Sequence, residues 1–214
     1  MSRAGAPDGI GARATKRVVH PIEAESYRII RAEVDTGDLP RCSRDVVERV
    51  IHTTADPSWR TDLVLDERSL AAGAEALAGG APLVVDVTMV AAGVTSYPSI
   101  CLVGAPQAAQ LAATDGLTRS AAAVRLAAER AGDGAVWAIG NAPTALYELI
   151  ALAAAGRVRP ALVIGVPVGY VGAAESKAAL RDTDLPQLSN VSARGGSAVA
   201  AAAVNALLYG DPLP

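Results

Sequence analysis

The sequence predicts an α/β fold, a three-layer sandwich in which helices cover both faces of a mainly parallel sheet. The central observation is a pair of short, wholly apolar runs, Ala135–Ile139 and Ala161–Val166, separated by a helical pattern that ends at Gly156. Continuous apolar strands that alternate with helices are typical of a parallel sheet buried on both faces. A length of 214 residues suits one such domain, which we place at residues 20–214.

The remaining elements follow from apolar periodicity and from helix start and stop signals. In chain order we expect a helix opening at Pro21, helices at Arg44–Thr53 and Asp66–Leu77, strands at Leu83–Val87 and Ile100–Val103, and helices at Ala121–Ala131 and Ala198–Leu208. The first residues, Met1–Val19, are rich in Gly, Ala and Arg and lack the apolar segment of a secretory signal, so we expect a disordered tail.

Composition excludes several classes of protein. The net charge of −3 and the absence of a long basic run argue against nucleic-acid binding. No stretch is long and apolar enough to suggest a membrane span. The two cysteines, Cys42 and Cys101, provide neither a disulfide framework nor a zinc site, and we expect free thiols in a reducing compartment, the cytoplasm.

The histidine of the second helix lies in an unusual place. At ~100° per residue, His52 points away from the apolar stripe that contains Val47 and Ile51. Glu48, one turn earlier on the same side, and the nearby helix end would both favour the protonated ring. Two interpretations of His52 remain open: an ordinary surface histidine, or an acid that faces a docked ligand. Ser26 falls within the apolar stripe of the first helix and needs a partner, either a backbone carbonyl or a ligand.

Other candidates lie where strands end, because ligands of such sheets bind at the carboxyl ends of the strands. Asn141 follows one strand directly, and Asp86 lies within another, where a carboxylate needs hydrogen-bond donors. Arg119 begins a helix, and a cation beside free N–H groups can build an anion site. Gly195 and Gly196 precede the last helix and permit close approach of backbone to a ligand. Ordinary turn chemistry and an exposed arginine are the alternatives.

Several longer segments resemble the precorrin-8X methylmutase family of corrin biosynthesis, in the right order and over about His20 to Gly210. They are HPIEAESYRIIRAEVD, RVIHTT, DVTMVAAGVTS, TRSAAA, AIGNAPTAL, RPALVIGVPVGYVGAAESK and RGGSAVAAAAVNALL. The resemblance implies an isomerase that moves a methyl group from C-11 to C-12 of precorrin-8X to give hydrogenobyrinate, with no metal and no external cofactor. It also implies a homodimer.

The resemblance also implies a set of site residues. The histidine of RVIHTT, His52, would be catalytic. Because the tetrapyrrole-derived substrate carries many carboxylates, donors from the matching motifs would bind it: Ser26, Arg31, Thr95, Arg119, Asn141, Lys177, Gly195 and Gly196. One segment departs from the family. Between Val94 and Ile100 there are only five residues, TSYPS, where many members have a longer basic segment, and we expect Tyr97 to cover the site instead.

Two other functions compete with this one. A dinucleotide-binding oxidoreductase would use Gly165, Gly169 and Gly172, but the spacing differs from G-x-G-x-x-G and no acidic residue lies about 20 positions after Gly172. A non-catalytic corrinoid-binding protein would keep the pocket without the reaction.

Overall fold

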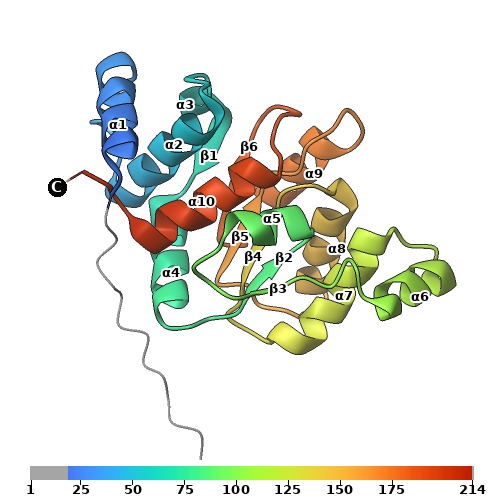
Figure 1. Cartoon of the computed structure of the whole chain (residues 1–214). Coiled ribbons are helices and arrows are strands. Elements are labelled where there is room, and N and C mark those ends of the chain that lie inside the picture. Colours follow the sequence, from blue (N-terminus) through green and yellow to red (C-terminus); the bar gives the residue numbers. More distant parts are fainter. Residues whose placement is uncertain (1–18, 214) are drawn as a thin grey trace, which may run out of the picture.

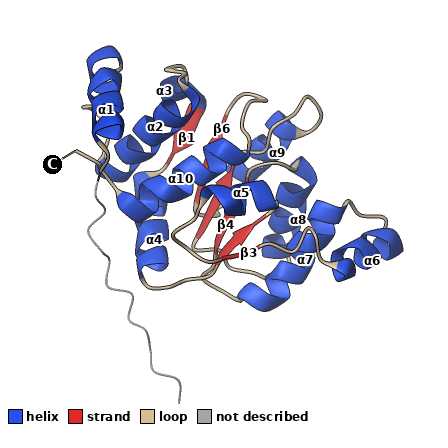
Figure 2. Ribbon diagram, in the orientation of Figure 1, coloured by secondary structure: helices blue, strands red, loops and turns tan. Residues whose placement is uncertain are grey.

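The computed structural model describes residues 19–213, which form a six-stranded sheet between two layers of helices (Figure 1). Figure 2 shows the strands gathered in the centre with helices around them. The predicted fold class is therefore confirmed. Of the predicted tail, Met1–Val19, all but Val19 lies outside the described residues, so that prediction is not tested. No helix in the described part of the chain is long and apolar enough to cross a membrane.

The sheet has the strand order β1-β6-β5-β4-β2-β3. Three strands match predicted ones: β2 (Leu83–Val85), β4 (Val136–Ile139) and β5 (Leu162–Gly165). The strand β3 (Ser99–Ile100) shares only Ile100 with the predicted strand Ile100–Val103, and all four are parallel. Two were not predicted. They are β6 (Gln187–Asn190), parallel to β5, and β1 (Leu63–Leu65), antiparallel to β6 at the edge. The polar residues of β6 hid it from a search for apolar runs.

Alternate residues of the central strands pack into two separate cores, as the pleat of a strand requires. On one face, Val136 and Ala138 pack with α2 (Arg41–Thr54), α4 (Glu67–Ala78) and α10 (Ser197–Tyr209). On the other face, Trp137 and Ile139 pack with α7 (Arg119–Ala131), α8 (Pro143–Ala154) and α9 (Ala173–Arg181). In Figure 1 the helix α10 crosses the front of the sheet.

The remaining helices lie outside these layers. The first helix, α1 (Pro21–Glu33), packs on α2, and the short α3 (Trp59–Asp62) leads into β1. The helix α5 (Thr88–Gly93) packs on α10, and α6 (Pro106–Asp115) packs on α7. The β5–α9 and β6–α10 connections lie at the upper right in Figure 1, where the carboxyl ends of the parallel strands meet.

Candidate active site

His52 and Ser26 meet between α1 and α2. The Ser26 hydroxyl lies 2.7 Å from Nδ1 of His52, and the buried ring of Tyr27 lies 5.3 Å from the imidazole, centroid to centroid. The serine in the apolar stripe of α1 therefore has a side-chain partner rather than a backbone carbonyl. His52 lies in the last turn of α2, where the helix dipole favours a protonated ring.

This pair lies in the wall of a groove of about 600 Å³ between the two helices. Most of the groove is apolar. Ile22 and Ile29 of α1 line it and are 74% and 50% exposed, and Ile51, Ala55 and Pro57 line the other side. A large, mainly apolar groove with a few placed polar groups is what a site for a bulky organic ligand needs.

Glu48 does not take the role expected for it beside His52. Its fully buried carboxylate accepts hydrogen bonds from Arg31 Nε and Nη2, at 3.0 and 2.8 Å, and from the Thr36 hydroxyl at 2.7 Å. A buried carboxylate is stabilised by a paired cation, and the side chain of Glu48 turns towards that cation.

Arg31 was predicted to bind substrate, but its side chain forms ion pairs within the protein. Besides Glu48, its guanidinium binds Asp211 at 2.8 Å, so it ties α1 to α2 and to the end of the chain. The hydrogen bond to Glu48 is the main cause that raises the pKa of Arg31 above its ordinary value. We therefore assign Arg31 a structural role.

The β4–α8 turn presents Asn141, and a buried aspartate holds it. Asp86, fully buried after β2, accepts hydrogen bonds from the backbone N–H groups of Gly140, Asn141 and Ala142 at 3.0, 2.8 and 2.8 Å. Burial raises the pKa of Asp86, and the three N–H donors oppose that shift. The donors that we expected for Asp86 are thus the backbone N–H groups of this turn. The Asn141 side chain remains exposed.

The same turn lies beside the start of α10 and the start of α7. A Cβ added at Gly140 would lie 3.0 Å from Cα of Ser197, which shows how closely the turn meets α10. On its other side, the Thr144 and Thr118 hydroxyls are 2.7 Å apart, and Thr118 caps the helix that begins with the exposed Arg119. Asn141, Arg119 and the glycine pair before α10 therefore belong to one continuous edge of the molecule.

Gly195 and Gly196 are pressed against the end of β5. Their φ angles are +154° and +122°, and a Cβ at Gly195 would lie 2.2 Å from the carbonyl oxygen of Val166. No side chain caps the start of α10, so its first N–H groups remain suited to an anion.

Lys177 supports this segment from inside the molecule. Its fully buried ammonium donates to Asn190 Oδ1 and to the backbone carbonyls of Ser192 and Arg194, at 2.9, 2.5 and 2.6 Å. Burial is the main cause that lowers the pKa of Lys177 to about 8. Because all three N–H bonds of an ammonium are matched by these acceptors, we assign Lys177 to shaping the β6–α10 loop rather than to binding substrate.

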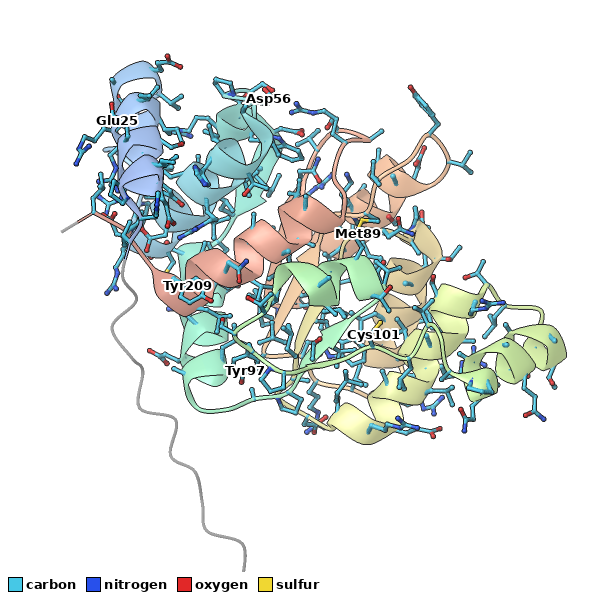
Figure 3. All side chains as sticks on the ribbon, in the orientation of Figure 1. Glu25, Asp56, Met89, Tyr97, Cys101 and Tyr209 are labelled. Carbon is cyan, nitrogen blue, oxygen red and sulfur yellow. The ribbon has the colours of Figure 1, made fainter. Side chains whose placement is uncertain are left out.

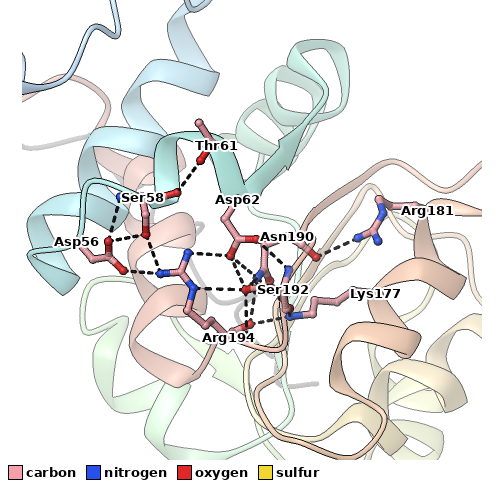
Figure 4. Close-up of polar contacts among 9 residues, drawn as sticks. All are labelled: Asp56, Ser58, Thr61, Asp62, Lys177, Arg181, Asn190, Ser192 and Arg194. Carbon is pink, nitrogen blue, oxygen red and sulfur yellow. Dashed lines mark hydrogen bonds and ion pairs between the residues drawn. The ribbon is translucent and has the colours of Figure 1, made fainter.

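A cluster that sequence reasoning missed surrounds Arg194 (Figure 4). Its guanidinium binds Asp56 and Ser58 of the loop after α2, and Asp62 at the end of α3. It also lies 4.6 Å from the centre of the Trp59 ring. The partners are more than a hundred residues away from Arg194 in the chain, so no local pattern marks them.

Two residues of the short segment after α5, Thr95 and Tyr97, do not line the groove. The Tyr97 hydroxyl donates to the carbonyls of Leu77 and Ala81, at 3.1 and 2.7 Å, just before β2 begins. Tyr97 is therefore at the amino ends of the strands and does not cover the site; Figure 3 shows it at the lower edge, far from Asp56. Through Tyr97 this short connection contacts the end of α4 rather than the groove.

Thr95 also lies away from the strand carboxyl ends. Its neighbours contact the second half of α10: Gly93 accepts from Asn205 at 2.8 Å, and Ser96 binds Tyr209. At 1.5 Å per residue, Asn205 is about 12 Å along the helix from Ser197.

The structure thus unites part of the predicted site. Ser26 and His52 line the groove, whereas Arg119, Asn141 and Lys177 do not. The described residues of one chain therefore do not form the single cavity that we expected to contain His52 and these three residues. The Arg194 cluster connects the two groups, because it links the loop after His52 to the glycine pair. Among the described residues, no group of side chains is arranged to hold a metal ion.

Known proteins match the chain over most of its length. Residues 21–210 match the family described as Precorrin-8X methylmutase. A Precorrin-8X methylmutase of Pseudomonas aeruginosa is 42% identical over 87% of this chain and 93% of its own. A Cobalt-precorrin-8 methylmutase of Methanothermobacter thermautotrophicus is 39% identical over 88% of this chain and 92% of its own. The solved precorrin-8X methylmutase of Thermus thermophilus superposes with a TM-score of 0.80, at 35% identity, over 87% of this chain and 93% of that one.

Proposed function

The chain belongs to the precorrin-8X methylmutase family and is an isomerase of cobalamin biosynthesis, and we propose that it moves the C-11 methyl group of precorrin-8X to C-12 with His52 as the acid. The observation that carries the assignment of His52 is its position beside Ser26 in the wall of a large apolar groove. The product is hydrogenobyrinate, and substrate and product have the same atoms and the same oxidation level.

His52 acts by proton donation to the macrocycle. One bond breaks, between C-11 and the methyl carbon, and one forms, between C-12 and the same carbon. A hydrogen bond or proton placed on the ring nitrogen next to the migrating centre draws electron density towards that nitrogen and favours the shift. The imidazole then takes the proton back, so no net proton is consumed. In this proposal Ser26 orients the ring through its contact with Nδ1.

Neutral donors hold most of the substrate's carboxylates in this proposal. Asn141, the Gly195–Gly196 backbone and the uncapped start of α10 supply hydrogen bonds, and Arg119 supplies a positive charge. Lys177 supports the glycine pair from behind through the Arg194 carbonyl, and Arg31 ties α1 to α2.

We further propose that the site is completed in a homodimer. Apolar side chains are strongly exposed on both sides of the site: Ile22 at 74% on α1, and Tyr170 and Val171 at 102% and 89% in the β5–α9 connection. Exposed apolar groups of this kind commonly mark protein interfaces. A second copy could bring its strand-end donors over the groove of the first. Sedimentation of the protein with and without bound product tests this, and a monomer in both states would contradict it.

The test of the function is single-turnover conversion, followed by the absorption change from substrate to product, with binding measured separately. The relatives are named for two substrates, so both the metal-free and the cobalt-containing macrocycle are used. We expect His52→Ala to bind its macrocycle normally and to convert it about 10²–10⁴-fold more slowly, the usual share of general acid catalysis.

His20→Ala is the matched control. His20 is the only other histidine of the sequence, and its Nδ1 accepts a hydrogen bond from Ile22 N at the start of α1. This variant should keep the wild-type rate. Ser26→Ala should slow conversion about tenfold, because one neutral hydrogen bond that orients the ring is lost. A wild-type protein that binds the macrocycles without converting either would instead be a corrinoid-binding protein, and a His52→Ala variant with full activity would remove His52 from the mechanism.

A further inference from the structure

Arg194 is a heavily bonded side chain near the site that the proposed mechanism does not use. It is 40% exposed, yet each nitrogen of its guanidinium donates a hydrogen bond. Nη1 binds Asp56 and lies 2.8 Å from Ser58 Oγ, Nη2 lies 3.0 Å from Asp62 Oδ2, and Nε lies 3.3 Å from Ser192 Oγ. Two carboxylates and an aromatic face on one planar cation define a single orientation of the group.

These contacts join two segments that both reach the substrate in our proposal. Asp56 follows His52 by four residues, directly after the helix end at Ala55, and Gly195 follows Arg194 directly. The Arg194 side chain therefore bridges the end of the catalytic helix and the glycine pair, as Figure 4 shows for its polar partners.

The glycine side of this bridge is itself fixed. The carbonyl oxygen of Arg194 accepts from Lys177 Nζ at 2.6 Å and from Asn190 Nδ2 at 3.0 Å. The N–H of Gly196 donates to the Val166 carbonyl at 2.9 Å, which holds the pair against β5. The sheet thus fixes the Arg194 backbone. Because the backbone is fixed, the Arg194 side chain holds the loop after His52 in a fixed position relative to the sheet.

We propose that Arg194 is a positioning residue for the methyl shift: it holds the His52 end of α2 at a set distance from the Gly195–Gly196 backbone and so aims the imidazole at the bound macrocycle. This inference rests on the proposed function. The groups that bind the macrocycle stay in place without Arg194, so its loss acts on the rate rather than on affinity. A displacement of about 1 Å at a reacting group can lower a rate about 10²-fold.

The variant that tests this is Arg194→Lys, which keeps the charge but cannot bind two carboxylates and stack on Trp59 at once. We expect its single-turnover rate to fall about 10–100-fold while the dissociation constant of the macrocycle changes less than about threefold. Asp56→Asn breaks the bridge from the exposed side and should give a smaller fall of the same kind. It carries the test if a thermal melt shows that Arg194→Lys does not fold.

Two comparisons separate positioning from a general loss of structure. In the His52→Ala background, Arg194→Lys should have no further effect on the residual rate, because a residue that acts through His52 has nothing left to position. Arg125→Lys is the matched control, since Arg125 also pairs with two carboxylates, Asp115 and Glu148, at 2.7 and 2.8 Å, but between α7 and its neighbours. It should keep the wild-type rate.

An equal fall of rate in both backgrounds, a loss of affinity as large as the loss of rate, or an unchanged rate would each overturn the inference. Failure of the proposed function is recognised separately, because it would appear as a wild-type protein without turnover or a His52→Ala variant with full activity.

Discussion

Two neighbouring turns at the carboxyl edge of the sheet are held by buried charges of opposite sign. Asp86 and Lys177 are both fully buried. Asp86 collects three backbone N–H groups of the β4–α8 turn, whereas Lys177 collects two backbone carbonyls of the β6–α10 loop together with the Asn190 side chain. Inward-facing N–H groups require a negative charge, and inward-facing carbonyl groups require a positive one.

The difference teaches how a buried charge is retained without a direct counter-ion. Burial moves the pKa of each group towards its neutral form, upwards for Asp86 and downwards to about 8 for Lys177. Aligned backbone dipoles replace part of the lost water, so each charge fixes several backbone groups of one turn at once. The turns that carry Asn141 and the glycine pair are rigid for this reason.

The largest stability effect is expected for Lys177→Met. It removes the donor from two buried carbonyls and should lower the free energy of unfolding by about 2–5 kcal/mol, measured by urea denaturation. Arg130→Met, at an exposed position of α7, is the control and should change stability by less than about 0.5 kcal/mol. A Lys177→Met protein as stable as wild type would show that the loop does not depend on the ammonium.

Asp86→Asn is the matching change in the other turn. An amide presents one oxygen where the carboxylate presents two, so at least one N–H donor of the turn loses its acceptor. We expect a loss of about 1.5–3 kcal/mol in the free energy of unfolding, together with weaker binding of the macrocycle through a displaced Asn141. Urea denaturation and a binding titration measure the two effects; unchanged values in both would mean that Asp86 does not hold the turn.

A buried carboxylate without donors should behave in the opposite way. Asp45 is 5% exposed, and its buried Oδ1 has no hydrogen-bond partner among the described residues. Burial, followed by the nearby Asp211, raises the pKa of Asp45 from 3.8 to about 6. The folded protein then binds more protons than the unfolded chain between these values, so Asp45 lowers stability as pH rises through this range.

We therefore expect Asp45→Asn to raise the free energy of unfolding at pH 7 by about 1–2 kcal/mol. The gain should shrink as the pH falls from about 6 and vanish near the ordinary pKa of an aspartate, about 4. Urea denaturation of both proteins at several pH values measures the difference. A variant less stable than wild type at pH 7 would show that Asp45 has a stabilising partner in solution.

The smallest effect is expected for Arg119→Ala, at the exposed edge of the same surface. An exposed cation facing a solvated carboxylate contributes about 0.5–1 kcal/mol, so the dissociation constant of the macrocycle should rise about two- to fivefold. Stability should not change, and added salt should remove the difference between the two proteins. An affinity difference that persists at high salt would contradict a charge contact at this position.

Sequence alone determined the layers of this protein and the identity of its family. Apolar runs such as Ala135–Ile139 define strands buried on both faces, because their period leaves no polar side to expose, and the helical stripe of α2 leaves His52 off its core face. Polar strands defeated the same reasoning. Gln187–Asn190 forms β6 with polar side chains at Ser189 and Asn190, whose partners Asp62, Lys177 and Arg181 are brought near only by the folded chain.

Tertiary structure decided which charged side chains face a ligand. Spacing placed Glu48 on the same side as His52, but a buried carboxylate is most stable beside a cation, and the packing of α1 supplied Arg31. Lys177 and Asp86 are likewise directed by inward-facing backbone groups of distant turns, and Arg194 by carboxylates more than a hundred residues earlier. Local patterns fix which face of an element is apolar, whereas the partner of a buried charge depends on contacts between segments that the local sequence does not encode.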